Sequence, residues 1–330
     1  MKKLINKSLL LLLVFSTVGF AGVLLEPWEM QNDMQVASEA IGAATYGGYI
    51  YAFGGNGTVW GIDTVQKYNP ATDTWTQVAP MPTRRHSLDC AVVDGYIYAI
   101  GGHVSNSRSE NERYDPSTDT WQSMAPKPTA VSGLGVAAYN GKIYTFGGNN
   151  YGSIRSVIEV YDPQTDSWQS AGNMPQTAQP WRAATLGDKI YLAGGSYNGT
   201  TIDHIWAYDP ITGTWDTSLP GLNIARSCHE LVVINDCLVV IGGGNSQDGT
   251  LNSVEWWKPG MTSWVLDEPL NVCRSQLGAE VVGNKIFAFG GYGGYDDNML
   301  SSTEYTILIP EPATILLLTL GGLALRRFGR

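Results

Sequence analysis

The chain has 330 residues, of which 43% are hydrophobic, 11% aromatic and 15% charged, and it contains 39 glycines. A chain of this composition can bury a large core, and its many glycines indicate β-structure interrupted by turns, which excludes a disordered protein. The formal net charge is −10, and residues 22 to 309 keep 14 basic against 29 acidic side chains. This acidic balance disfavours nucleic acid as a partner.

Residues 1–21 have the pattern of a secretory signal peptide. Lys2, Lys3 and Lys7 precede an apolar run over residues 9–18, and small residues at positions 19 and 21 favour cleavage after Ala21. The alternative is an N-terminal helix of the fold. The pattern predicts export.

Pairs of glycines follow strand-like runs at intervals of 46 to 48 residues. The pairs are Gly54-Gly55, Gly101-Gly102, Gly147-Gly148, Gly194-Gly195, Gly242-Gly243 and Gly290-Gly291. An aromatic residue follows the first glycine of each pair after 13 to 15 positions, as Tyr68, Tyr114, Tyr161, Tyr208, Trp257 and Tyr305. Seven residues beyond the first five aromatics come Trp75, Trp121, Trp168, Trp215 and Trp264.

Each repeat is expected to contain four short strands. In the second repeat we place them at residues 87–93, 96–100, 110–114 and 120–124, with Asp94-Gly95 as a hairpin turn. Another turn, residues 115–119, contains a proline that presets φ.

The spacing of paired glycine, aromatic residue and tryptophan resembles the kelch repeat over about residues 28 to 306. This resemblance implies an all-β, six-bladed β-propeller across residues 22–308. The glycines are expected to let neighbouring backbones approach closely, and the aromatic rings to fill the space between blades.

The sixth repeat lacks its tryptophan near the C-terminal end, because Pro312 stands where it should be. Trp28, however, precedes Gly54 by 26 residues, the same separation that joins Trp75 to Gly101. We therefore expect an N-terminal outer strand around Trp28 to pair with the segment around Tyr305 and close the ring.

In kelch propellers the loops from strand four to strand one and from strand two to strand three surround the channel mouth on one face. Counting back 16 residues from each glycine pair gives Ser38, Arg85, Val131, Ala178, Arg226 and Arg274. Other candidates on this face are His86, His103, Tyr151, Trp181, Arg182, Tyr197, His229, Glu230, Asn245 and Tyr292. Arginines beside aromatic rings suit an anionic sugar or a peptide carboxylate, although the alternative is a structural role for the arginines.

Metal and cofactor chemistry is not expected. The four histidines have no metal-like spacing, and the copper ligands of galactose oxidase, which shares this repeat, cannot be placed here. Of the four cysteines, Cys228 and Cys273 are the pair for which a disulfide is possible, and the others are expected to be buried thiols.

Residues 309–330 resemble the PEP-CTERM sorting signal. Pro310, Glu311 and Pro312 precede a short apolar segment, and Arg326 and Arg327 follow it. The resemblance implies a Gram-negative host, an exosortase as partner, transient anchoring in the inner membrane and a cell-envelope or extracellular destination. A retained membrane anchor is the alternative.

We therefore expect a non-catalytic binding or interaction module for a glycan or a protein. The alternative is an enzyme similar to the bacterial sialic acid mutarotases, in which Arg226, Arg274 and Glu230 would provide charge pairing and proton transfer.

Overall fold

The computed structural model describes residues 24–179, 182–294 and 298–309. The signal-peptide segment and the sorting motif (Pro310, Glu311, Pro312, Arg326 and Arg327) lie outside these residues. Across the described ranges the regular structure is entirely β, and no helix there is long and apolar enough to cross a membrane.

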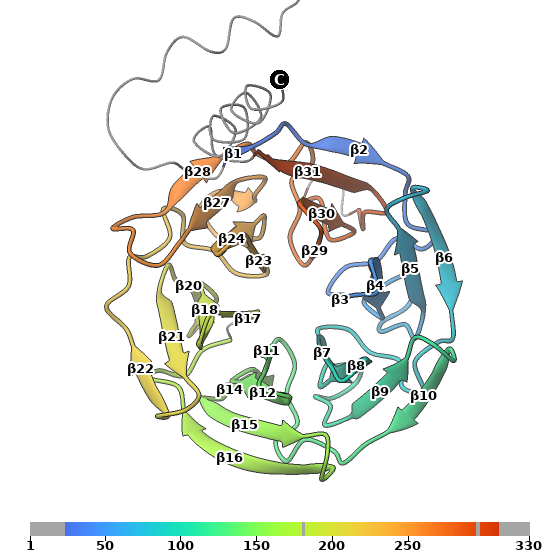
Figure 1. Cartoon of the computed structure of the whole chain (residues 1–330), viewed down its shortest axis with the longest axis vertical. Helices are drawn as coiled ribbons and strands as arrows, with labels where there is room; N and C mark the ends of the chain where they lie inside the picture. Colours follow the sequence, from blue (N-terminus) through green and yellow to red (C-terminus); the bar gives the residue numbers. More distant parts are fainter. Residues whose placement is uncertain (1–23, 180–181, 295–297, 310–330) are drawn as a thin grey trace, which may run out of the picture. The chain divides into compact units, whose positions relative to one another are not determined.

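Residues Leu25–Leu308 form one compact unit of six antiparallel sheets, or blades, arranged in a ring (Figure 1). Blade 1 contains β3 (Gly42–Tyr46), β4 (Tyr49–Phe53), β5 (Val65–Asn69) and β6 (Thr74–Val78). Blade 2 contains β7 (Asp89–Val93), β8 (Tyr96–Ile100), β9 (Asn111–Asp115) and β10 (Thr120–Ser123). Blade 3 contains β11 (Gly135–Tyr139), β12 (Lys142–Phe146), β15 (Val157–Asp162) and β16 (Ser167–Asn173).

Blade 4 contains β17 (Ala183–Leu186), β18 (Lys189–Ala193), β21 (Ile205–Asp209) and β22 (Thr214–Asp216). Blade 5 contains β23 (Glu230–Ile234), β24 (Cys237–Ile241), β27 (Val254–Trp257) and β28 (Val265–Asp267). Blade 6 contains β29 (Gly278–Val282), β30 (Lys285–Phe289), β31 (Thr303–Ile309), β1 (Leu24–Leu25) and β2 (Glu29–Gln31). Short ribbons extend three loops, as β13 (Asn149–Asn150) with β14 (Ser153–Ile154), β19 (Ser196–Tyr197) with β20 (Thr200–Thr201), and β25 (Gly244–Asn245) with β26 (Gly249–Thr250).

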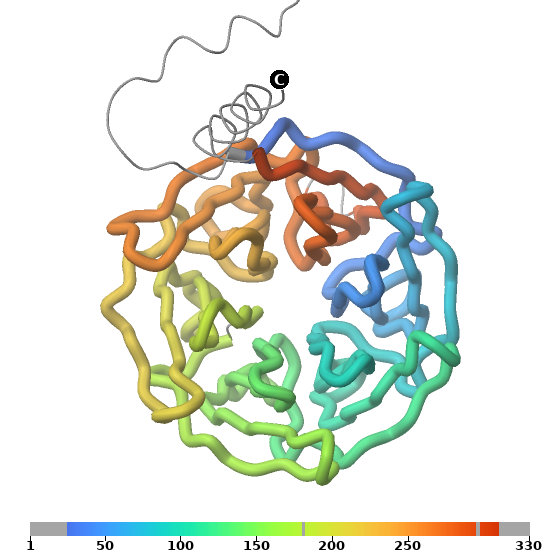
Figure 2. Tube along the Cα trace, in the orientation of Figure 1, coloured from blue at the N-terminus to red at the C-terminus, as the bar shows by residue number. Residues whose placement is uncertain are grey.

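The first strand of each blade lines the centre of the ring. These strands contact one another in the cyclic order β3, β7, β11, β17, β23, β29 and back to β3. The chain passes once around the ring, so that its first described strands lie beside β31 (Figure 2). The predicted six-bladed propeller is therefore confirmed.

The four strands predicted for the second repeat are present with ends that differ by at most two residues. The turn that joins its first two strands lies at Asp94 and Gly95, which have φ values of 51° and 84°. Two consecutive positive φ values match the twist of the flanking strands, which is why Asp-Gly favours this turn.

Each glycine pair connects its blade to the next blade by a backbone hydrogen bond. Gly54 and Gly55 have φ values of 59° and 102°, and a Cβ on Gly54 would lie 2.3 Å from the Arg85 carbonyl oxygen. The Gly55 N–H donates to that oxygen over 3.0 Å. The same bond recurs around the ring, as Gly102 to Val131, Gly148 to Ala178, Gly195 to Arg226, Gly243 to Arg274 and Gly291 to Ser38. The predicted close approach of backbones is confirmed.

The tryptophans join each blade to the preceding blade at the outside of the ring. Trp121 Nε1 donates to the Ala79 carbonyl of blade 1 over 2.9 Å. Equivalent bonds to backbone carbonyls run from Trp168 to Ala125, from Trp215 to Asn173, from Trp264 to Pro220 and from Trp28 to Glu268. Trp75 also bonds to the preceding blade, but its Nε1 donates to the side-chain hydroxyl of Thr303. Trp28 therefore serves as the sixth tryptophan of the repeat.

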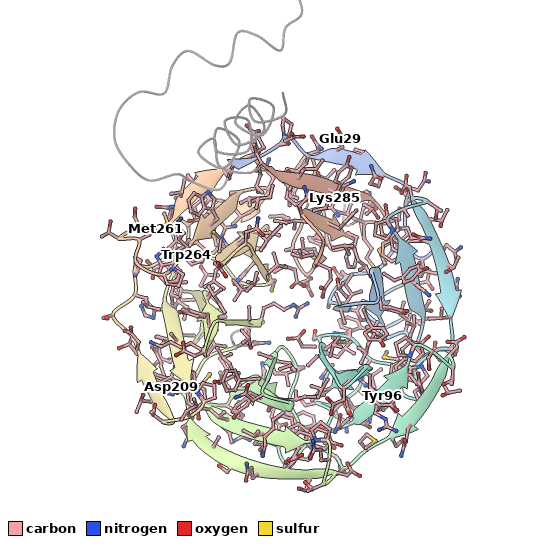
Figure 3. The ribbon with its side chains drawn as sticks, viewed as in Figure 1. Glu29, Tyr96, Asp209, Met261, Trp264 and Lys285 are labelled. Carbon is pink, nitrogen blue, oxygen red and sulfur yellow. The ribbon has the colours of Figure 1, made fainter. Side chains whose placement is uncertain are left out.

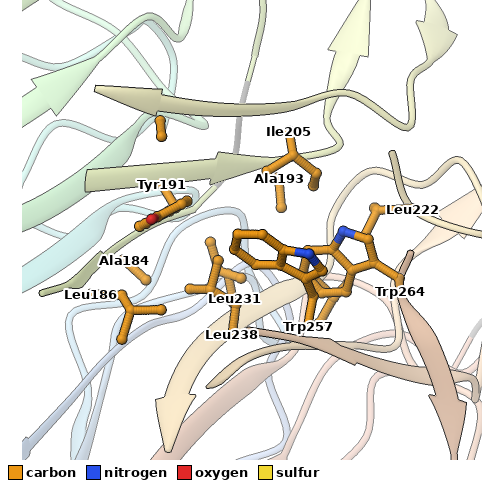
Figure 4. Packing of buried hydrophobic residues seen from close by; sticks show 12 residues of the cluster. Ala184, Leu186, Tyr191, Ala193, Ile205, Leu222, Leu231, Leu238, Trp257 and Trp264 are labelled. Carbon is orange, nitrogen blue, oxygen red and sulfur yellow. The ribbon is translucent and has the colours of Figure 1, made fainter. Parts of the chain in front are cut away.

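The hydrophobic core is divided into clusters between neighbouring blades. Between blades 4 and 5, Trp257 and Trp264 stack with ring centroids 6.1 Å apart and pack with Leu222 and Leu238 (Figure 4). Similar clusters lie between blades 1 and 2, 2 and 3, 3 and 4, and 6 and 1, within the ring of side chains that Figure 3 draws.

Blade 6 closes as expected, with one change of register. Glu29 of β2 lies opposite Tyr305 of β31, and its carboxylate accepts a hydrogen bond from the Tyr305 hydroxyl over 2.7 Å. However, Ile286 pairs with Thr306, whereas the equivalent Ile97 of blade 2 pairs with the repeat aromatic Tyr114. Assigning Tyr305 to the repeat aromatic was therefore wrong by one residue, and because side chains alternate along a strand, its ring lies on the other face of the blade.

Replacing Trp28 with Ala should lower the free energy of unfolding by about 3–5 kcal/mol, because the change empties a buried site and removes the bond to blade 5. Trp28 is 5% exposed, whereas Trp60 is 72% exposed, so Trp60→Ala is the matched control and should change stability by about 0.5 kcal/mol or less. Urea denaturation measures both. Equal stabilities of the two variants would contradict closure through Trp28.

Candidate functional site

One face of the propeller collects the loops between the second and third strands and the loops that lead from one blade to the next. In an antiparallel four-stranded blade, strands two and four end where strands one and three begin. These loops carry nearly all of the candidate residues, and we call this side the loop face.

The three arginines expected at the channel mouth are fully buried inside their own blades. Arg85, Arg226 and Arg274 are each 0% exposed and form ion pairs with Glu112, Glu255 and Glu304. The Arg226 and Arg274 pairs measure 2.6 and 2.7 Å. The expected exposure of these guanidinium groups is thus corrected, and a ligand contact would require each ion pair to open.

The glutamate partners explain where the arginine side chains lie. In blade 5, Arg226 donates to the carbonyls of Gly242 and Ser253 and to the carboxylate of Glu255, so the protein satisfies its charge and several N–H groups. In blade 3, Lys127 makes the corresponding buried pair with Glu159. Sequence analysis missed these glutamates, although Glu112, Glu159 and Glu255 each lie two residues before a repeat aromatic.

The channel itself is crossed by Arg182. Its Nε donates to both oxygens of Glu230 over 2.7 Å, and its Nη2 donates to the Ile41 carbonyl of blade 1 over 2.8 Å. The Asp89 carboxylate lies 3.9 Å away. The structure therefore brings together two of the predicted residues, Arg182 and Glu230, but inside the channel rather than at an open mouth.

Three other blades have glycine at the position of these carboxylates. Gly42, Gly135 and Gly278 stand at the start of β3, β11 and β29, where blades 2 and 5 have Asp89 and Glu230. A cavity of about 230 Å³ in the channel is lined by Arg182, by the carboxylates of Asp89, Glu230 and Glu280, and by several alanine and valine side chains.

Burial raises the pKa of all three channel carboxylates, to about 6 for Asp89, about 7 for Glu230 and about 8 for Glu280. Arg182 lowers each of these values, but one guanidinium does not compensate three carboxylates. Sequence analysis missed Asp89 and Glu280, since only the closed ring places them together.

The two histidines proposed for the site are buried and neutral at pH 7. Burial lowers the pKa of His86 to about 4 and that of His229 to about 3. His103 lies beside His86, with ring centroids 5.3 Å apart. Trp181 lies outside the described residues.

Two hollows on the loop face share Tyr292 and are lined by residues of blades 4, 5, 6 and 1; we call them together the groove. One hollow of about 260 Å³ contains Trp60 and Glu39, a second of about 480 Å³ contains Asn245 and Gln276, and Tyr292 lines both. The second hollow is also lined by Thr201, Ser227, Ser246, Thr250 and Ser275. Among the described residues lining these hollows there is no lysine or arginine, and Glu39 is the one carboxylate.

No group of three or more His, Cys, Asp or Glu side chains suitable for a metal ion occurs in the described part of the chain. All four cysteines lie in the described residues and none of them forms a disulfide, so the suggested Cys228–Cys273 bridge is not formed in this structure. Cys90 and Cys237 are buried, as expected for structural thiols.

Replacing Arg226 with Met should destabilise the propeller by about 3–5 kcal/mol, because Glu255 would remain buried without its cation. Adding Glu255→Leu should recover a large part of this loss, since no buried charge then remains. Thermal unfolding of both variants tests the structural role. A stable single variant would return Arg226 to the candidates for ligand contact.

Comparison with known proteins agrees with this architecture. The kelch motif model matches residues 40–82, 84–128 and 225–270, and the model of the KLHDC2/KLHL20/DRC7 kelch-repeats domain matches residues 113–243. Kelch-like protein 28 of Mus musculus and of Homo sapiens is 37% identical over 83 residues, which are 23% of this chain and 14% of those proteins.

A solved structure titled "Structure of YjhT" superposes with a TM-score of 0.72 at 19% sequence identity, covering 83% of this chain and 95% of the other. At this identity the likeness concerns the fold. Together with the six sheets and the repeated glycine and tryptophan bonds, the matches show that the chain carries kelch repeats and folds as a six-bladed kelch-type β-propeller.

Proposed function

We propose that this propeller is a non-catalytic binding module that holds a neutral oligosaccharide or polysaccharide in the groove of the loop face. Kelch propellers commonly serve as protein-interaction modules, so a protein ligand is the competing possibility. The observation that favours a glycan is the lining of the groove, which combines aromatic rings with hydroxyl and amide groups and has little charge.

The chemistry of the groove matches that of a sugar. Trp60, which is 72% exposed, and Tyr292 offer ring surfaces to the apolar face of a pyranose. Asn245 and Gln276 supply amide groups that both donate and accept hydrogen bonds, as sugar hydroxyls require. A concave, mostly preformed surface with a few convergent polar groups is typical of small-ligand sites.

An anionic ligand is less well supported than the sequence suggested. Arg85, Arg226 and Arg274 are buried in ion pairs, and Arg182 is engaged with Glu230. The mutarotase alternative assigned roles to Arg226, Arg274 and Glu230, and all three would have to leave buried ion pairs to reach a substrate. We therefore do not propose catalysis.

Screening the full-length protein on an array of neutral and anionic oligosaccharides should give neutral ligands. By calorimetry, Trp60→Ala should weaken binding of the best one about tenfold, or 1.4 kcal/mol. Tyr151→Ala is the matched control, because Tyr151 is 71% exposed on the same face but does not line the groove.

Equal affinities of these two variants would contradict the groove as the site. If the protein binds no neutral oligosaccharide on the array, the proposal of a neutral glycan ligand is contradicted. Capture of a defined protein by the loop face would then favour the protein alternative.

We also propose export to the envelope or exterior of a Gram-negative cell, followed by sorting through an exosortase-type enzyme. The support comes from the sequence patterns of residues 1–21 and 309–330. Mass spectrometry of protein recovered from its host should find an N-terminus after Ala21 and loss of the segment that contains Arg326 and Arg327. An intact Met1 would contradict export, and an intact tail would contradict sorting by cleavage.

A further inference from the structure

Two histidines on the loop face of blade 2 lie directly opposite each other. His86 precedes β7 and His103 follows β8, and the two form an antiparallel bridge. The backbone N–H of His86 donates to the backbone carbonyl of His103 over 2.9 Å, and the backbone N–H of His103 donates to the carbonyl of His86 over 2.8 Å. Opposed residues of an antiparallel pair project their side chains to the same side, so the two imidazole rings are neighbours by construction.

The His86 side chain is buried, and one of its ring nitrogens lies within hydrogen-bond distance of Ser87. Its side chain is 7% exposed, and its Nδ1 lies 2.9 Å from the Ser87 hydroxyl oxygen. Among the described residues its Nε2 has no hydrogen-bond partner. An imidazole with one nitrogen held by an oxygen and the other one bare is the usual arrangement of a metal-ligating histidine.

The spacing of the rings suits one shared ion. A metal–nitrogen bond of about 2.0–2.1 Å places each ring centroid about 3.2 Å from the metal, so two ligands at a tetrahedral angle have centroids about 5 Å apart. The observed separation is 5.3 Å.

We propose that His86 and His103 form a chelating pair that takes one divalent transition-metal cation, with water in the remaining positions. Neither histidine lines the hollows of the proposed glycan groove, although Trp60 of that groove lies beside His86. Two imidazoles with open positions favour Ni²⁺, Cu²⁺ or Zn²⁺ over hard cations such as Ca²⁺.

Charges around the pair allow this binding. Burial lowers the pKa of both histidines, and Arg108 lowers that of His103 further. Arg108 is the nearby cation, and it lies 3.5 Å from the carboxylate of Glu110. The Trp60 ring lies 5.6 Å from the His86 ring, close enough for a bound ion to affect its fluorescence.

Titration of the untagged full-length protein with NiCl₂, followed by calorimetry, should show one ion bound per chain. His103→Asn should weaken this binding at least tenfold without unfolding the protein, because His103 is only partly buried. His204→Asn is the matched control, because the His204 side chain is 52% exposed in another blade, and it should leave the affinity unchanged.

A second readout locates the ion. Ni²⁺ should quench the fluorescence of the wild-type protein, and Trp60→Phe should remove most of this quenching while calorimetric binding persists. Absence of saturable binding, equal loss in His103→Asn and His204→Asn, or quenching that survives Trp60→Phe would each overturn the proposed site.

Discussion

The blades of this propeller are held together near the channel by one backbone hydrogen bond that is repeated six times. In every blade the second glycine of the pair donates its N–H to a carbonyl of the next blade, and Gly291 completes the circle by donating to Ser38. The bond needs a backbone with positive φ and no Cβ, because a side chain at Gly54 would overlap the accepting carbonyl. We call this bond the inter-blade joint.

The joint uses only the carbonyl of the accepting residue, which leaves its side chain free to vary. The six acceptors are Ser38, Arg85, Val131, Ala178, Arg226 and Arg274. Where the acceptor is arginine, its side chain turns back into its own blade, and the repeat provides a glutamate for it. In blade 4 the same two positions hold Ala178 and Trp206, both buried and apolar, so no charge needs a partner. In blade 3 the acceptor is Val131, and Lys127 from another position provides the cation for Glu159. The buried charge pair therefore varies from blade to blade, while the bond between blades stays the same.

The sequence was informative where a residue's role depends on the backbone or on the repeat period. Glycine pairs, the Asp94-Gly95 turn and the ring-closing Trp28 are of this kind, and all three occupy the predicted places. It was less informative about side-chain direction. Counting from Gly101 identifies Arg85 as the residue at the repeated position, whose carbonyl accepts the bond from Gly55. It cannot tell whether the guanidinium enters the channel or the blade, because that depends on Glu112.

The channel residues were the hardest to predict, since they meet only after the ring has closed. Arg182 contacts Glu230 and the Ile41 carbonyl, which are 48 and 141 residues away in sequence. Nothing in the local pattern distinguishes it from an exposed arginine. The assignment of Tyr305 as the repeat aromatic was wrong for a related reason, because a shift of one residue in β31 moves a side chain to the opposite face of the blade.

The closure of blade 6 also makes the two ends of the propeller neighbours. Glu26 donates its backbone N–H to the Ile307 carbonyl over 3.0 Å, so a short linker could join the chain there. New ends could then be opened in another blade, such as the Asp94-Gly95 hairpin, without removing an inter-blade joint. The propeller is in this sense a circular object, and circular permutation would make all the strands of blade 6 contiguous in sequence.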